Sequence, residues 1–293
     1  MLAKVLSLKL PSSPTWYIVP VAAVLILLGL LLTNGVISVN TEAVSDFLTG
    51  EFALYVLVGL AAQLVDGALG MAYGVTSNSF LLSLGVTPAV SSASVHFAEM
   101  FTTGASAISH FRFKNINKKL FKSLLIPGVL GSITGAYLLS DVIDGNAIKP
   151  FIAFYMLILG VIIIRKAIQK TFVKNKTKRI SILAATGGFL DSVGGGGWGP
   201  IVTSTLLGQG RDPRYTIGSV NAAEFAVAFA SGITFMLFTG VDSWKVVLGL
   251  IVGGVMAAPF GAMLVGKIKR KPLMLIVGIL VIGLSIRTIL LSI

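Results

Sequence analysis

Residues 66–74 read DGALGMAYG, and residues 191–199 read DSVGGGGWG. Each stretch lies inside an apolar segment, 52–83 or 180–209, that is too long for one ordinary membrane span. Glycine is less favourable than alanine inside a helix by up to about 1 kcal/mol per residue. Both segments are therefore expected to be broken helices.

The two stretches lie 125 residues apart and belong to an internal duplication. Laying the chain on itself at that offset, without gaps, aligns acids, glycines and prolines in one register. The matched pairs are Asp66 with Asp191, Gly70 with Gly195, Tyr73 with Trp198, Gly74 with Gly199, Ser79 with Ser204, Gly85 with Gly210, Pro88 with Pro213, Ser94 with Ser219, Val95 with Val220, Ala98 with Ala223 and Glu99 with Glu224. Two related halves are therefore predicted.

The composition places the chain in a membrane. Of 293 residues, 55% are hydrophobic and 12% charged, about half the charged fraction of a soluble domain. Apolar runs of roughly 20 residues match the thickness of a bilayer core. The net charge of +12 is explained by basic loops between spans, so nucleic acid is not an expected partner. Without cysteine, disulfides and thiolate metal sites are excluded.

Basic residues predict the orientation. Arg and Lys accumulate in cytoplasmic loops. The N-terminus, with Lys4 and Lys9, and the segments 112–122, 165–179, 211–214 and 267–271 are therefore expected inside the cell; together they hold 20 of the 23 basic residues. Both broken segments must then return to the side from which they entered.

This orientation predicts an all-α inverted repeat. Each half consists of a broken re-entrant helix pair followed by three transmembrane helices, so the halves have opposite orientation, as in secondary transporters. The expected units are an N-terminal transmembrane helix in 1–40, repeat one at 52–166, a basic cytoplasmic linker at 167–179 and repeat two at 180–293. The pattern does not define an oligomeric state.

Four acids within apolar segments are candidates for coupling or gating: Asp66, Glu99, Asp191 and Glu224. Ionisable groups inside a membrane are costly and usually mark a pathway or relay. Alternatively, the two aspartates cap the half-helices that follow the breaks. His96 lies one helical turn before Glu99, as Asn221 does before Glu224, and these pairs share a helix face. A histidine next to a carboxylate can titrate near neutral pH, or it can be a satisfied polar contact.

The breaks are candidates for binding a small anion. Their exposed backbone N–H groups and half-helix N-termini attract negative charge. The candidates are Gly70, Gly74, Thr76, Ser77, Asn78, Gly195, Gly199, Thr203 and Ser204, together with His96 and Asn221. Equally, the hydroxyl and amide groups could satisfy backbone groups freed by the breaks. No nucleotide loop, cofactor motif or metal-binding pattern is found.

These motifs resemble a known family. The stretch 66–74, the helix Ser94–Glu99, and the second copy from Gly187–Asp191 through Asn221–Glu224 are similar to the sulfite exporter TauE/SafE family. The resemblance covers about residues 52–290 and implies movement of sulfite, sulfonates or related organic acids across the bacterial cytoplasmic membrane.

The expected function is secondary export of a small sulfur-containing anion by alternating access, with coupling to protons through the acids. The alternatives are a passive anion channel and a cation-coupled importer of the same substrates. An intramembrane enzyme is not expected, because neither a zinc-protease motif nor a nucleophile elbow occurs.

Overall fold

The computed structural model describes residues 50–169, 179–239, 244–264 and 269–292, and these residues contain helices and no strand. The predicted first helix and most of the basic linker lie outside them. The helices are α3 (Gly50–Leu69), α4 (Tyr73–Ser83), α5 (Pro88–Arg112), α6 (Lys118–Tyr137), the π-helix η2 (Leu138–Val142), α7 (Gly145–Ile168), α8 (Ile180–Gly194), the π-helix η3 (Gly199–Thr203), α9 (Ser204–Gly208), α10 (Pro213–Phe238), α11 (Trp244–Leu264) and α12 (Arg270–Ser292).

Six of these helical stretches are long and apolar enough to cross a membrane: α3, α6 with η2, and α7, α10, α11 and α12. Large apolar side chains also remain exposed on the outer helices, among them Ile126 (66%), Phe151 (71%) and Ile279 (64%). An outer surface of this kind is suited to lipid rather than water. The prediction of an all-α polytopic membrane protein is confirmed.

Both long apolar segments break at the glycines. Between α3 and α4, Gly70 has φ +68° and Ala72 has φ 109°. After α8, Gly195 has φ +64°. Glycine adopts this left-handed conformation freely, whereas alanine rarely does. The predicted break in each segment is therefore confirmed.

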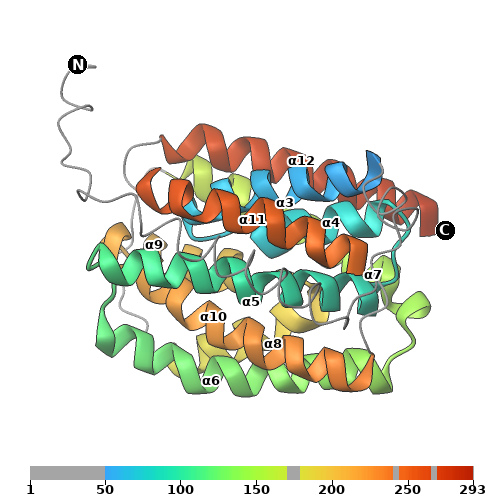
Figure 1. The fold of residues 1–293 in the computed structure, drawn as a ribbon, viewed down its shortest axis with the longest axis horizontal. Coiled ribbons are helices and arrows are strands. Elements are labelled where there is room, and N and C mark those ends of the chain that lie inside the picture. The colour runs from blue at the N-terminus through green and yellow to red at the C-terminus, as the bar shows by residue number, and fades with distance from the viewer. Residues whose placement is uncertain (1–49, 170–178, 240–243, 265–268, 293) are drawn as a thin grey trace, which may run out of the picture. The chain divides into compact units, whose positions relative to one another are not determined.

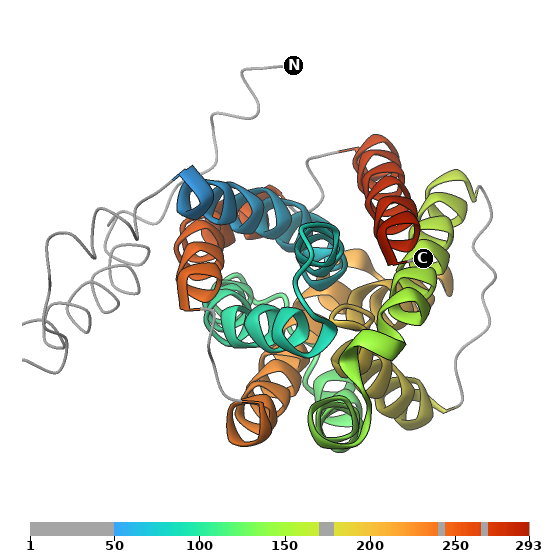
Figure 2. The same cartoon turned by 90° about the vertical axis from the view of Figure 1, so that its right-hand side faces the viewer.

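The main helix pairs are α3 with α11, α6 with α8, α5 with α10 and α7 with α12. Figures 1 and 2 show α12 beside α7 and α3 beside α11. A 125-residue shift converts the first pair into the second, because α3 corresponds to α8 and α11 to α6. The same shift exchanges α5 with α10 and α7 with α12, so each of those two pairs maps onto itself.

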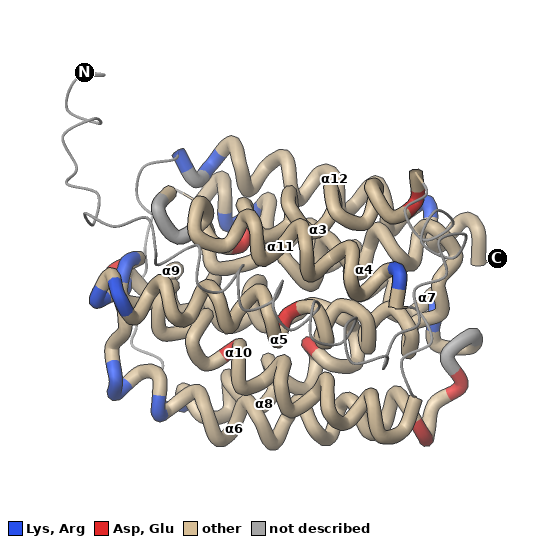
Figure 3. Tube along the Cα trace, viewed as in Figure 1, with Lys and Arg blue, Asp and Glu red and all other residues tan. Residues whose placement is uncertain are grey.

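One end of the bundle, here called the basic end, collects the loops rich in Lys and Arg (Figure 3). There Arg214 donates hydrogen bonds to Asn115 Oδ1 (2.5 Å) and to the Phe113 carbonyl (2.7 Å). Lys166 of α7, Gly208 of α9 and Lys271 of α12 line one cavity at this end.

Each broken segment begins and ends at the same end of the bundle. α8 runs beside α6 from the basic end, and α9 returns there, with Gly208 next to the Lys166 ammonium. α3 starts at the opposite end, and α4 returns to it, where the Ser83 carbonyl accepts a hydrogen bond from Arg287 near the end of α12. Each broken segment thus turns back on itself in the bundle (Figure 1), while its re-entrant course in a membrane stays a prediction.

Candidate functional site

The two glycine breaks touch each other in the interior. A Cβ atom placed on Gly74 would lie 2.9 Å from Gly196 Cα and 3.0 Å from the Gly195 carbonyl oxygen. A Cβ atom on Gly199 would lie 2.7 Å from Met71 Cβ. Such distances leave no room for side chains, so the glycines are required for the two breaks to meet.

Polar side chains of the first half satisfy backbone groups of the second break. Asn78 Nδ2 donates to the Gly194 carbonyl at 2.5 Å, and Ser91 Oγ in turn donates to Asn78 Oδ1. Ser92 Oγ donates to the Ser192 carbonyl at 2.7 Å. Asn78 therefore acts as predicted by the alternative interpretation, because its side chain satisfies a backbone carbonyl left without a helical partner at the break.

The candidate hydroxyls divide into two groups. Ser204 Oγ donates to the Pro200 carbonyl, so it is engaged locally. Thr76, Ser77 and Thr203 are buried, and their hydroxyls lack a hydrogen-bond partner within the described segments. These three hydroxyl groups therefore remain candidates for binding.

Asp191 caps the second break. Its Oδ1 atom accepts hydrogen bonds from the backbone N–H groups of Gly197 (2.7 Å) and Trp198 (2.9 Å). The capping interpretation is confirmed for this residue. Asp66, its repeat partner, is different: both of its carboxyl oxygens are buried without a hydrogen bond of ordinary geometry to any described residue, although the Tyr73 N–H lies beside it.

His96 connects two acids from different halves of the chain. Its Nδ1 atom lies 3.5 Å from Glu99 Oε2 on the same helix, and its Nε2 atom lies 3.6 Å from Asp191 Oδ2 on α8. Phe235 packs against the ring edge-on, with centroids 5.7 Å apart. The predicted shared face of His96 and Glu99 is present, whereas the contact with Asp191 was not predicted.

The four predicted acids are all buried, and two of them, Glu99 and Asp191, flank His96. Asp66, Glu99, Asp191 and Glu224 are each at most 4% exposed, and they lie close enough for their charges to interact. Glu99 also borders the break, because a Cβ atom on Gly74 would lie 3.1 Å from its Oε1 atom. No Lys or Arg of the described residues forms an ion pair with any of the four. Four uncompensated buried charges would cost many kcal/mol, so the cluster must hold protons or cations.

The second half lacks the histidine contact. Asn221 stands where His96 stands in the first half, and its Nδ2 atom donates to Ser106 Oγ at 3.2 Å. Asn221 Oδ1 and Glu224 Oε2 are buried without a hydrogen-bond partner among the described residues. The two copies of the acid-bearing helix therefore differ in environment.

His96 and two acids form a group of potential metal ligands. His96, Glu99 and Asp191 are the group within the described segments whose ligand atoms lie within 4.8 Å of one another. However, Glu99 and Asp191 face opposite nitrogens of the imidazole ring. Neither ring nitrogen has a hydrogen-bond partner among the described residues, so the two acids flank the imidazole without bonding to it.

The family model for the sulfite exporter TauE/SafE family matches residues 55–288. This chain belongs to that family. It is 41% identical over 249 residues to the probable membrane transporter protein YtnM of Bacillus subtilis (strain 168), covering 82% of this chain and 83% of the relative. It is 23% identical to the probable membrane transporter protein YunE of the same organism, covering 79% of this chain and 95% of that protein.

A plant TauE/SafE protein matches a shorter region. Sulfite exporter TauE/SafE family protein 3 of Arabidopsis thaliana is 33% identical over 79 residues, or 27% of this chain and 17% of the plant protein. No solved structure matches this TauE/SafE member. The family is one of membrane transporters rather than enzymes, which confirms that no catalytic activity is to be assigned.

Tyr155 of this TauE/SafE protein belongs to the site but was not predicted. Its hydroxyl is buried without a hydrogen-bond partner in the described structure, and a Cβ atom on Gly197 would collide with it. Its repeat partner is Leu280, so the duplication does not point to it. The sequence feature that could have pointed to Tyr155 is that it is the one polar side chain between Pro150 and Arg165.

Proposed function

We propose that this TauE/SafE family protein is a secondary transporter that exports a small sulfur-containing anion, such as sulfite, a sulfonate or a related organic acid, across the bacterial cytoplasmic membrane. The observation that carries the proposal is the meeting of two broken helices beside four buried acids and His96. Broken helices that meet inside a membrane bundle are typical of the substrate sites of secondary transporters.

The inverted repeat forms part of this proposal. It is supported by helix pairs that exchange under the 125-residue shift, and by hairpins that open toward opposite ends. On the positive-inside rule, the basic end faces the cytoplasm, and so does the N-terminus. Residues 52–166 and 180–293 are then the two repeats, and they move relative to each other during alternating access.

The breaks are proposed to bind the anion. α4 and η3 start next to the contact between the two breaks, and backbone N–H groups at helix starts favour negative charge. Further donors for oxyanion oxygens are the hydroxyls that lack a partner in the described part of the chain, those of Thr76, Ser77, Thr203 and Tyr155. Asn78 and Asp191 hold the second break in shape.

Outward movement of an anion is favoured by an inside-negative potential, by about 2.3 kcal/mol per charge for each 100 mV. The acid cluster is proposed to exchange protons during the cycle, because its charges lack Lys or Arg partners among the described residues. The same lack of partners supports the second candidate, a cation-coupled importer. A passive channel is less well supported, since every acid of the cluster is buried.

The test is flux in proteoliposomes. Sulfite, sulfate and a series of alkanesulfonates are presented with and without a pH gradient, and with imposed potentials of either sign. The proposal expects saturable flux of one of these anions that responds to the pH gradient. Flux that ignores pH and does not saturate would favour the channel, and dependence on sodium would favour the importer.

A further inference from the structure

A cavity of about 180 Å³ lies at the basic end between α7, α9 and α12. Its wall includes Met71, Lys166, Ser204, Gly208 and Lys271, and no acidic residue. The cavity is separate from the acid cluster, and none of the candidate roles above accounts for its two lysines.

Neither lysine of this cavity has an acidic partner among the described residues. In the part of the chain that the structure describes, neither Lys166 nor Lys271 forms an ion pair. Gly208 leaves room for the Lys166 ammonium, because a Cβ atom at position 208 would lie 3.0 Å from Lys166 Nζ. Two ammonium groups around one hollow attract an anion, and the apolar walls strengthen that attraction.

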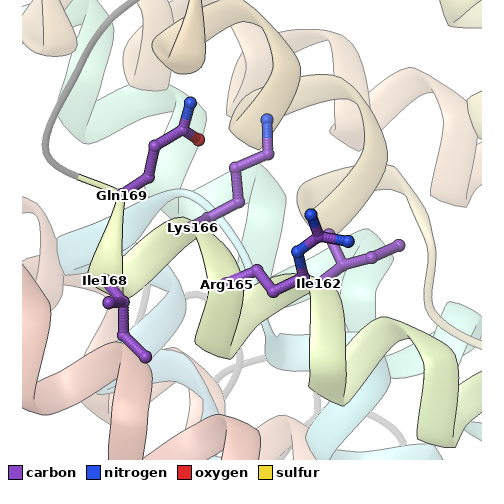
Figure 4. A pocket seen from close by; sticks show the side chains of 5 residues that line it. All are labelled: Ile162, Arg165, Lys166, Ile168 and Gln169. Carbon is purple, nitrogen blue, oxygen red and sulfur yellow. The ribbon is translucent and has the colours of Figure 1, made fainter.

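The approach to this cavity is also basic. Lys166 lines a second, larger cavity of about 560 Å³, together with Arg165 and Gln169. Figure 4 shows these side chains projecting from the last turns of α7. Lys166 therefore lines both cavities.

The inner wall of the cavity belongs to the junction of the two breaks. Met71 is 2% exposed and lies in the first break, between α3 and α4. A Cβ atom on Gly199 of the second break would lie 2.7 Å from Met71 Cβ. The cavity thus occupies the space between the basic end and the proposed substrate site.

We infer that this cavity is the port through which the anion reaches the breaks from the basic end, and that Lys166 and Lys271 bind it there. The inference rests on the proposed function and adds to it a second, outer anion site. The recognised group is a small oxyanion. Such a group could come from a dissolved anion or from a lipid phosphate, and the port requires the dissolved anion.

A single cysteine can report occupancy, because the chain contains no natural one. Ala167→Cys places a thiol in the half-buried wall of this cavity. The rate of its reaction with N-ethylmaleimide is measured against methanesulfonate concentration, in nanodiscs of neutral phosphatidylcholine and in nanodiscs containing phosphatidylglycerol. Ser123→Cys, in another cavity at the same end, serves as the reporter control.

We expect methanesulfonate to protect the cysteine at position 167 but not the one at position 123, in neutral lipid. Lys166→Gln and Lys271→Gln should each raise the half-protecting concentration at least fivefold. Lys269→Gln, which removes a charge at the same end outside the cavity wall, should change it less than twofold. A label-free check is the rise in melting temperature that methanesulfonate causes, which should shrink in the Lys166→Gln/Lys271→Gln double variant.

Two results would overturn the inference. One is an unchanged reaction rate and melting temperature at 100 mM methanesulfonate. The other is protection that follows phosphatidylglycerol alone, since the lysines would then bind lipid. Wild-type flux, measured separately, keeps the two proposals apart: flux without protection rejects only the port, and protection without flux of any tested anion rejects the transport proposal.

Discussion

His96 Nε2 lies 3.6 Å from Asp191 Oδ2, although the two residues are 95 positions apart and belong to different copies of the duplicated unit. Asp191 at the same time holds the backbone of the second break through its other oxygen. The contact therefore links the acid-bearing helix α5 to the shape of the break in the other half. Protonation of His96 would turn this contact into an ion pair.

A double-mutant cycle tests this link. His96→Asn introduces the residue found in the second half, and Asp191→Asn removes the charge while leaving a carbonyl oxygen to cap the break. We expect each single change to reduce flux at least tenfold. The flux of the double variant should be no lower than that of the less active single variant, because the two changes remove the same interaction. The measurement is initial flux in proteoliposomes. Additive losses would show that the residues act separately.

Glu99 and Glu224 should differ in their influence on the pH dependence of transport. Glutamine mimics the protonated acid, and His96 faces Glu99 whereas Asn221 is hydrogen-bonded to Ser106. Glu99→Gln should therefore flatten the dependence of flux on pH more than Glu224→Gln does. Initial flux is recorded between pH 5.5 and 8.5, alongside melting temperatures. Wild-type pH profiles in two well-folded variants would remove the proton-coupling role.

Gly74→Ala should separate the two breaks. The new Cβ atom would lie 2.9 Å from Gly196 Cα, and overpacking of this kind typically destabilises by about 1–3 kcal/mol. We expect a lower melting temperature and little flux. Gly283→Ala is the matched control, because that glycine lies in α12 with nothing within 4 Å of the added atom. Equal behaviour of both variants would contradict the close contact.

Asn78→Ala should loosen the second break. It removes the hydrogen bond to the Gly194 carbonyl and leaves that buried acceptor unpaired, at a cost of about 1–3 kcal/mol. The free energy of unfolding is compared with that of Thr134→Ala, whose exposed hydroxyl bonds only its own helix at Leu130. A loss no larger than in Thr134→Ala would mean that the break does not depend on Asn78.

The orientation can be tested with introduced cysteines. Lys119→Cys and Lys174→Cys should react with a membrane-impermeant maleimide only after the cells are opened, because basic loops stay in the cytoplasm. Asp141→Cys, in η2 just beyond the end of α6 away from Lys118, should react in intact cells. Labelling of position 174 from outside would reverse the proposed direction of every helix.

Local patterns in the sequence predicted the helices, the breaks and the four intramembrane acids. The length of an apolar run indicates a membrane-spanning helix, and consecutive glycines indicate a break in it. A charged residue inside an apolar run is recognised without knowing which residues pack against it. The duplication added Glu224 and Asp191 as partners of Glu99 and Asp66. These features depend on residues close along the chain or on a constant offset.

Contacts across the two halves were decided only by tertiary structure. The approach of His96 to Asp191, the hydrogen bond from Asn78 to Gly194 and the hydroxyl of Tyr155 at the second break all follow from how α4, α5, α7 and α8 pack. The duplication cannot reveal them, because Tyr155 corresponds to Leu280 and His96 to Asn221. A repeat relates a residue to its copy, whereas packing brings it against whatever the other half presents.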